Sequence, residues 1–196
     1  PWMVEARKLK SQVKRDTLVS FHSECLSHTY GQYVSHGLEF IYGIVGGKLR
    51  RVRLTGWDGS GGHDPSVLPP HLIELEYEPV GDTPPLRGTL YASTYHFPHY
   101  WWFRGCHTDG RIVEGDIINH DGLDRNDVEN EWYVPFMAQM EQVFRTNTSP
   151  ETVADILHKL ATLLAGQMSA MNGGRWVGMD EVEKFTLSSK VISRWD

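Results

Sequence analysis

The sequence has few cysteines and no long apolar run. Its 196 residues hold only Cys25 and Cys106, too few for a disulfide-stapled secreted scaffold and typical of a reducing compartment. The longest apolar run is far too short to cross a membrane, and no secretory signal pattern is present. These absences predict an intracellular protein that does not associate with membranes. With 40% hydrophobic residues, the chain can still bury an ordinary core.

Charge is distributed unevenly along the chain. Residues 1–53 carry nine Lys or Arg against four acids, a net of +5, whereas residues 54–196 carry ten against 21, a net of −11. The basic residues form two groups: Arg7, Lys8, Lys10, Lys14 and Arg15 at the N-terminus, and Lys48, Arg50, Arg51 and Arg53 further on. Such groups contact nucleic acid or an acidic partner, or simply form a solvated helix face and a charge-protected strand edge. No aromatics are interleaved with them, so a stacking platform for single strands is not indicated.

The hydrophobic pattern predicts an α, β, α order. We expect helices at 2–15, 22–44, 132–144 and 149–171, the last with Ser149 as its N-cap. Strands are expected at 48–55, 71–78, 87–95, 99–107 and 111–119. The last four would form a largely antiparallel meander, because their connections are short. This predicts one compact domain made of a basic helical segment (1–47), a β-rich core (48–145) and a C-terminal helix with a docked tail (146–196). The chain begins at Pro1 without a methionine, as a fragment, a tagged chain or a released piece would.

The stretch from residue 86 to 122 holds the most informative pattern. An aromatic strand leads into Asp109-Gly110, a dipeptide that supplies positive φ in a two-residue turn, and β-branched residues resume the strand. If this dipeptide is the whole loop, counting outward puts His99 opposite His120, one residue from Asp121. The predicted hairpin therefore brings an imidazole and a carboxylate within side-chain reach, and His96 is the alternative imidazole.

These pieces resemble the C-terminal half of ubiquitin-specific-protease-like, papain-fold cysteine peptidases, including divergent viral and mobile-element members. The resemblance rests on Leu68-Pro69-Pro70 before a strand, Leu86-x-Gly88-x-x-Tyr91, His96-Phe97 or His99-Tyr100, and His120-Asp121-Gly122. It covers residues 67–123. It implies an α+β fold in which a largely antiparallel sheet packs against helices. It also implies a hydrolase, a thiol protease that cleaves a peptide or isopeptide bond. No cofactor or metal would be needed, and the partner would be a protein or peptide such as a ubiquitin-like substrate.

The resemblance implies a catalytic triad of Cys25, His99 or His96, and Asp121. Its nucleophile box, Gly-Asn-Thr-Cys-Trp, is absent, and only Cys25 precedes the histidines. The apolar residues after Cys25 recur at helical spacing, which places the thiol near a helix start that would favour the thiolate. The histidine would take the thiol proton, and Asp121 would orient the imidazole. Taken singly, each of these residues is also typical of a structural position.

Other classes of function stay open. The missing nucleophile box favours an inactive peptidase-like fold that binds proteins, and the basic N-terminal group favours a nucleic-acid-binding accessory protein. His107, Asp109 and His158 follow the His-x-Asp…His order of iron-dependent oxygenases. The turn role of Asp109 and the helical setting of His158 count against a metal site.

Overall fold

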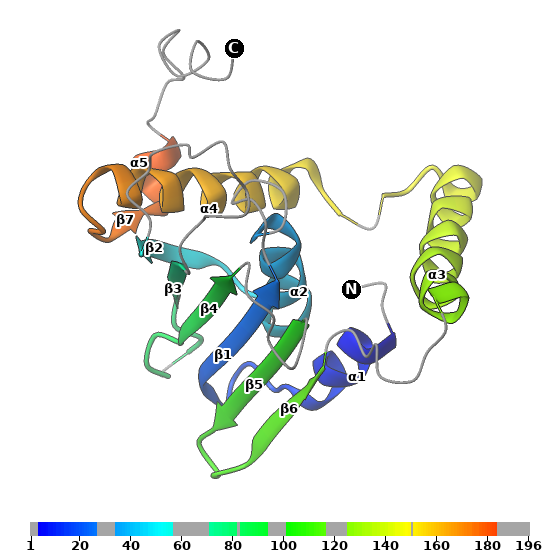
Figure 1. Ribbon diagram of the computed structural model, residues 1–196, viewed down its shortest axis with the longest axis horizontal. Coiled ribbons are helices and arrows are strands. Elements are labelled where there is room, and N and C mark those ends of the chain that lie inside the picture. Colours follow the sequence, from blue (N-terminus) through cyan, green and yellow to red (C-terminus); the bar gives the residue numbers. More distant parts are fainter. Residues whose placement is uncertain are drawn as a thin grey trace, which may run out of the picture.

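The computed structural model describes residues 4–26, 34–56, 71–81, 83–93, 101–116, 125–149 and 151–183. Figure 1 shows a twisted sheet covered by helices on one face, with helix α3 standing apart from it. The elements in chain order are α1 (Val4–Gln12), β1 (Leu18–Leu26), α2 (Ser35–Val45), β2 (Leu49–Thr55), β3 (His71–Tyr77), β4 (Arg87–Ser93), β5 (Trp101–His107), β6 (Ile112–Asp116), α3 (Arg125–Thr146), α4 (Val153–Met171), β7 (Val177–Gly178) and α5 (Met179–Glu183).

The sheet has seven strands in the order β6-β5-β1-β4-β3-β2-β7. Strand β1 lies in the middle, parallel to β4 and antiparallel to β5, and the other neighbouring pairs are antiparallel. The expected meander is therefore interrupted, because β4 and β5 are separated by a strand from the start of the chain. The expected helix over 22–44 is wrong in its first part, where β1 runs to Leu26, and α2 begins only at Ser35.

Strand β1 follows a period of two that its small residues conceal. Phe21, Ser23 and Cys25 point to the helix layer and are buried, whereas His22 and Glu24 point to the opposite face and are half-buried. Because Ser23 is polar and Cys25 is small, the alternation of apolar and polar residues is weak, and the apolar stripe of α2 dominates the pattern.

The β5–β6 hairpin forms as expected, but in a shifted register. Cys106 pairs with Ile112, and the His107 N–H donates to the Arg111 carbonyl at 2.9 Å. The loop therefore holds three residues and ends on Gly110, whose φ is +79°. Three-residue hairpin loops commonly place glycine in this left-handed position. The two-residue loop from which the pairing was counted is therefore wrong, and His99 and His120 themselves lie outside the described residues.

Helices α2 and α4 pack on the same face of the sheet and are joined to it by side-chain hydrogen bonds. Ser169 of α4 is fully buried and accepts the Leu54 N–H of β2 at 2.9 Å. The Tyr42 hydroxyl of α2 is hydrogen-bonded to Thr162 of α4. Helix α4 begins with Thr152 as its N-cap in a capping box, not with Ser149, because Asp155 returns the hydrogen bond to the cap.

The segment after α4 returns to the sheet as β7 beside β2. The Trp176 ring lies under two guanidinium groups, with the Cζ of Arg51 4.7 Å and that of Arg53 5.2 Å from the ring centroid. These cation–π contacts hold the start of the tail on the sheet edge. Phe185 and Trp195, expected to dock as well, lie outside the described residues.

Candidate functional site

One end of the sheet gathers chemically capable side chains. The register places Leu26 of β1 beside Ser93 of β4, and Cys25 beside Trp101 of β5, so β1 and β4 end where β5 begins. His71 opens β3 beside Ala92 at the same end. Functional residues commonly collect at the strand ends from which the connecting loops leave, because the sheet below supplies a rigid base. We therefore take this end of the sheet as the candidate site.

His36 is the histidine that α2 presents at this end. It lies in the first turn of the helix and is exposed, with its ring 6.3 Å from the ring of Trp101 in an edge-on arrangement. Phe40, one turn later, contacts the same indole at 5.1 Å. Trp101 is itself 7% exposed, so the two α2 side chains rest against a fixed surface. Histidine is the side chain most often used for proton transfer in proteins.

Helix α2 reaches the strand ends because Gly37 has no side chain. A Cβ at Gly37 would lie 3.0 Å from the Leu90 Cδ2 and 3.1 Å from the Cys25 Sγ. The first turn of α2 therefore sits directly on β1 and β4. The sequence analysis did not single out His36, because its expected helix began at residue 22. The apolar stripe that starts at Leu38 is the signal that would have placed the start of the helix correctly.

Cys25 lies beneath this helix and is fully buried. Burial raises the pKa of its thiol to about 12. The expectation that Cys25 stands near a helix start as a ready thiolate is therefore wrong: it lies near the end of a strand and is protonated at neutral pH. Its packing against Gly37 is that of a small apolar side chain.

The remaining members of the predicted triad cannot be placed beside it. His96, His99 and Asp121 lie outside the described residues, and so does His120. Among described residues, no cluster of His, Cys, Asp and Glu is arranged to hold a metal ion. Of the oxygenase-like set, His107 is hydrogen-bonded to Thr17 at 2.9 Å, and Asp109 accepts the Arg111 N–H in the turn at 3.0 Å. His158 accepts the Leu49 N–H at 3.2 Å from helix α4, so these three residues have structural roles.

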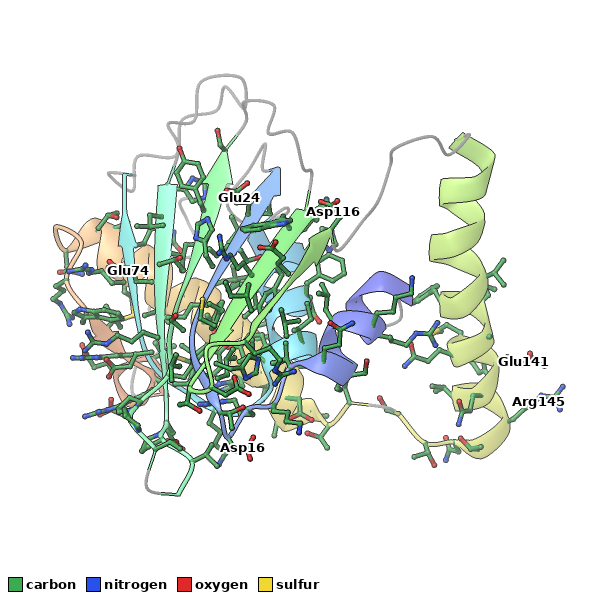
Figure 2. All side chains as sticks on the ribbon, turned by 90° about the horizontal axis from the view of Figure 1, so that it is seen from below. Asp16, Glu24, Glu74, Asp116, Glu141 and Arg145 are labelled. Carbon is green, nitrogen blue, oxygen red and sulfur yellow. The ribbon has the colours of Figure 1, made fainter. Side chains whose placement is uncertain are left out.

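A second polar group lies on the uncovered face of the sheet, below the strand ends. His22 bonds Thr89 through Nδ1 at 2.7 Å and Glu24 through Nε2 at 3.3 Å, and its ring stands edge-on to Trp102. Figure 2 looks onto this face and shows Glu24 near the strand ends. A carboxylate on one ring nitrogen and a hydroxyl on the other fix the imidazole in place.

Comparison with known proteins finds relatives by structure only. No family model matches the sequence, and no curated protein matches it. The structure is similar to a probable dehydrogenase from Thermotoga maritima, with a TM-score of 0.69 and 13% identity over 91% of this chain and 62% of that one. GenD2 from gentamicin A biosynthesis, solved in complex with NAD, has a TM-score of 0.69 and 15% identity over 90% of this chain and 61% of its own.

A third neighbour is scyllo-inositol dehydrogenase from Lactobacillus casei, solved with NAD(H) and scyllo-inositol. It has a TM-score of 0.63 and 13% identity over 90% of this chain and 62% of its own. The chain thus spans about 60% of the length of each of these three proteins. At identities this low, the structural similarity establishes a shared fold and nothing beyond it.

These matches correct the interpretation as a papain-fold peptidase. The neighbours are oxidoreductases, so the predicted resemblance, the papain-like fold and the hydrolase activity with its Cys-His-Asp triad are wrong. The pattern in residues 67–123 was misleading because β1 separates β4 from β5, which the resemblance treats as neighbours. The predicted protein and nucleic-acid partners are not tested by the matches and stay predictions. In the part of the chain that the structure describes, no helix is long and apolar enough to span a membrane.

Proposed function

We propose that this chain forms the substrate side of an NAD-dependent oxidoreductase that acts on a hydroxyl group of a polyol or sugar. The observation that carries the proposal is the match of about nine-tenths of the chain to dehydrogenases, two of them solved with NAD and one also with a cyclic polyol. The free thiols of Cys25 and Cys106 suit a reducing intracellular compartment, which we include in the proposal.

The residues of this chain do not fit a dinucleotide site. Such a site needs a glycine-rich turn between a strand and the N-terminus of a helix, where the backbone approaches the pyrophosphate. The sequence has no G-x-G-x-x-G run, and the described sheet has one parallel pair and helices on one face only. We therefore assign no cofactor contact to this chain, and the nucleotide would be held by a separate domain of the kind that the longer neighbours have room for.

The strand-end site supplies what the substrate side needs. Oxidation of a hydroxyl group requires an acceptor for its proton, and histidine is the side chain best matched to neutral pH. His36 is exposed at the strand ends, and the buried Trp101 beside it supports the imidazole edge-on. In the proposal His36 takes the hydroxyl proton and Trp101 holds the imidazole in position.

Ligand binding tests the proposal without the nucleotide. Myo-inositol, scyllo-inositol and glucose are titrated into the chain at millimolar concentrations, with saturation-transfer NMR and tryptophan fluorescence as readouts. We expect weak binding of at least one of them, and an at least tenfold loss of affinity in the His36→Gln variant. The matched control is His22→Gln, a histidine on the uncovered face of the sheet that is less exposed than His36.

The two variants make the outcome specific. Binding that is lost in His36→Gln and kept in His22→Gln supports the strand-end site. No binding of any polyol, or equal binding by both variants and the wild type, contradicts it. Tight binding of NAD by this chain alone would contradict the proposal that this chain binds the substrate and a separate domain binds the nucleotide.

A further inference from the structure

Three arginines surround one buried carboxylate on the uncovered face of the sheet. Strand residues alternate between the two faces, so Glu76 of β3 shares this face with Glu74, which Figure 2 labels. Glu76 is nevertheless only 1% exposed, because guanidinium groups from Arg50 and Arg51 of β2 and Arg87 of β4 cover it. Arg50 and Arg51 belong to the second basic group of the sequence, to which the proposed function gives no role.

An irregularity in β2 explains why two successive arginines reach the same carboxylate. The register with β3 shifts between Leu49 and Arg51, so Arg50 is an extra residue of β2. A bulge of this kind changes the direction of a side chain, and here it turns Arg50 to the same face as Arg51. Arg87 reaches Glu76 from the other side, because β4 pairs these two residues directly.

The carboxylate of Glu76 has little capacity left for further donors. Arg51 donates to both of its oxygens, from Nε to Oε1 at 2.9 Å and from Nη2 to Oε2 at 2.8 Å. The Arg87 Nε donates to Oε2 at 3.0 Å, and the Arg50 Nη1 lies 3.5 Å from Oε1. The hydrogen bonds from Arg51 are the main cause that lowers the pKa of Glu76, so this carboxylate is ionised at neutral pH.

Arg51 is held on two sides, whereas Arg50 and Arg87 keep free donors. The Arg51 guanidinium also lies over the Trp176 ring, 4.7 Å from its centroid. The side chains of Arg50 and Arg87 are 58% and 69% exposed, and each has one nitrogen at Glu76. Their other guanidinium nitrogens make no hydrogen bond to any residue that the structure describes. These nitrogens are therefore open to a ligand that arrives from solvent.

The cluster carries an excess of positive charge. Three guanidinium groups share the single negative charge of Glu76, which leaves two positive charges uncompensated. Lys48 and Glu78, whose backbones are hydrogen-bonded at 2.9 Å, add one charge of each sign. Asp180 of α5 lies beside Gly178 of β7, and with its carboxylate counted one positive charge still remains. Like charges held this close repel each other, so an anion at the cluster is favoured.

We propose that the arginine cluster, which consists of Arg50, Arg51 and Arg87 around Glu76, binds a phosphate group. The Arg50 Nη1 and the Arg87 Nε lie against the two oxygens of one carboxylate, so they are at most roughly 9 Å apart. A phosphate that accepts a hydrogen bond of ~2.8 Å on each side spans roughly 8 Å, which fits between them. The planar fork of arginine suits such an anion, and a phosphate with about two negative charges at neutral pH offsets the excess.

The phosphate site is separate from the strand-end site. His71 opens β3 at the strand ends, and Glu76 lies further along the same strand, at a distance of roughly 17 Å. A polyol bound beside His36 would not reach the arginine cluster, so this proposal does not depend on the proposed function. The ligand is inorganic phosphate or the phosphate ester of a small metabolite, because the arginines recognise the same group in both.

Phosphate binding is measured on the intact chain at constant ionic strength. Inorganic phosphate replaces sodium chloride stepwise at pH 7.5, and the NMR signals of the arginine Nε–H groups report which side chains are occupied. We expect the Arg51 and Arg87 signals to shift and saturate, with a dissociation constant on the order of 1 mM. Arg50→Gln and Arg87→Gln should each weaken binding roughly tenfold. Arg145→Gln, which removes an exposed arginine paired with one carboxylate on α3, is the matched control and should bind as the wild type does.

Two further ligands identify the source of the phosphate group, and circular dichroism melts confirm that all variants fold. Tighter binding of glycerol 3-phosphate than of inorganic phosphate, lost in Arg50→Gln, supports the site and identifies an ester. Equal or weaker binding of the ester supports the site and identifies free phosphate. The proposal is overturned if the arginine signals do not shift, if the Arg145→Gln control weakens binding as the cluster variants do, or if Arg50→Gln has no effect. It is also overturned if a single-stranded oligonucleotide binds the cluster more tightly than both phosphates, which would indicate a nucleic-acid surface.

Discussion

Replacing Gly88 by alanine should destabilise the fold more than any other added methyl group in the described strands. Phe21 of β1 is paired with Gly88 on β4 and with Gly105 on β5. A Cβ at Gly88 would lie 2.0, 2.1 and 2.4 Å from three atoms of the Phe21 ring. Real Cβ atoms do not approach a ring so closely, so either the ring or the strand must move.

The Phe21 ring has little room to yield. It is stacked on Phe103 at 5.8 Å between centroids and meets the edge of Tyr77 at 6.0 Å, and all three side chains are buried. Overpacking a tight core costs about 1–3 kcal/mol, and we expect the upper end, about 3 kcal/mol, because the obstacle is a rigid ring held on two sides. For a chain of this length that corresponds to a fall of roughly 6–12 °C in Tm.

Urea denaturation followed by circular dichroism measures the effect. The matched control is Gly115→Ala, where the nearest side-chain atom would be the Leu9 Cδ2 at 3.5 Å, an ordinary contact. In a Phe21→Leu background the ring is gone, and the added cost of Gly88→Ala should fall to roughly 1 kcal/mol or less, a coupling that a double-mutant cycle reads directly. The reasoning is refuted if Gly88→Ala costs no more than Gly115→Ala, or if its cost is the same with and without the ring.

Three further predictions concern buried polar groups. Ser169→Ala should cost about 1–3 kcal/mol in urea denaturation, because it leaves the buried Leu54 N–H without its acceptor; an unchanged midpoint would contradict this. Native Cys25 should resist iodoacetamide at pH 8, since burial raises its pKa to about 12, whereas the half-exposed Cys106 reacts first and mass spectrometry assigns the site. Burial, and then Arg111, lower the pKa of His107, so the stability it contributes is present above its unfolded value of about 6.5 and is lost as pH falls through that value toward the folded pKa. The fall in Tm between pH 7.5 and 5.5 should therefore be smaller in His107→Asn, and an equal fall would count against it.

The sequence predicts regular elements well where periodicity is strong. The helix over 149–171 was expected from its apolar stripe and is observed as α4 from Val153 to Met171. The strands β2, β3, β4 and β5 also fall within two residues of their expected bounds. Strand β1 was missed because two of its buried positions hold Ser23 and Cys25, not the large apolar residues whose alternation predicts a strand.

The candidate site was harder to predict, because its residues are adjacent only through the sheet. His36 and Trp101 are 65 positions apart in the sequence and meet because β1 places α2 over the start of β5. The predicted triad was built from the order of Cys25, His99 and Asp121, and residue order does not report which strands are neighbours. Because β1 lies between β4 and β5, the spacing of these residues in the sequence does not predict which of them lie close together.

The sequence by itself determined the local structure: the amphipathic helices, the alternating strands, the Asp109-Gly110 turn and the uneven distribution of charge. Only the tertiary structure decided which strands are neighbours and which face of the sheet the helices cover. The physical reason is that periodicity reports which side of an element is apolar, whereas strand pairing depends on contacts between distant segments such as β1 and β4. The row of side chains across the sheet that reads Arg53, Glu74, Thr89, His22, Arg104 and Glu114 exists only in that pairing, because its six residues come from six different strands.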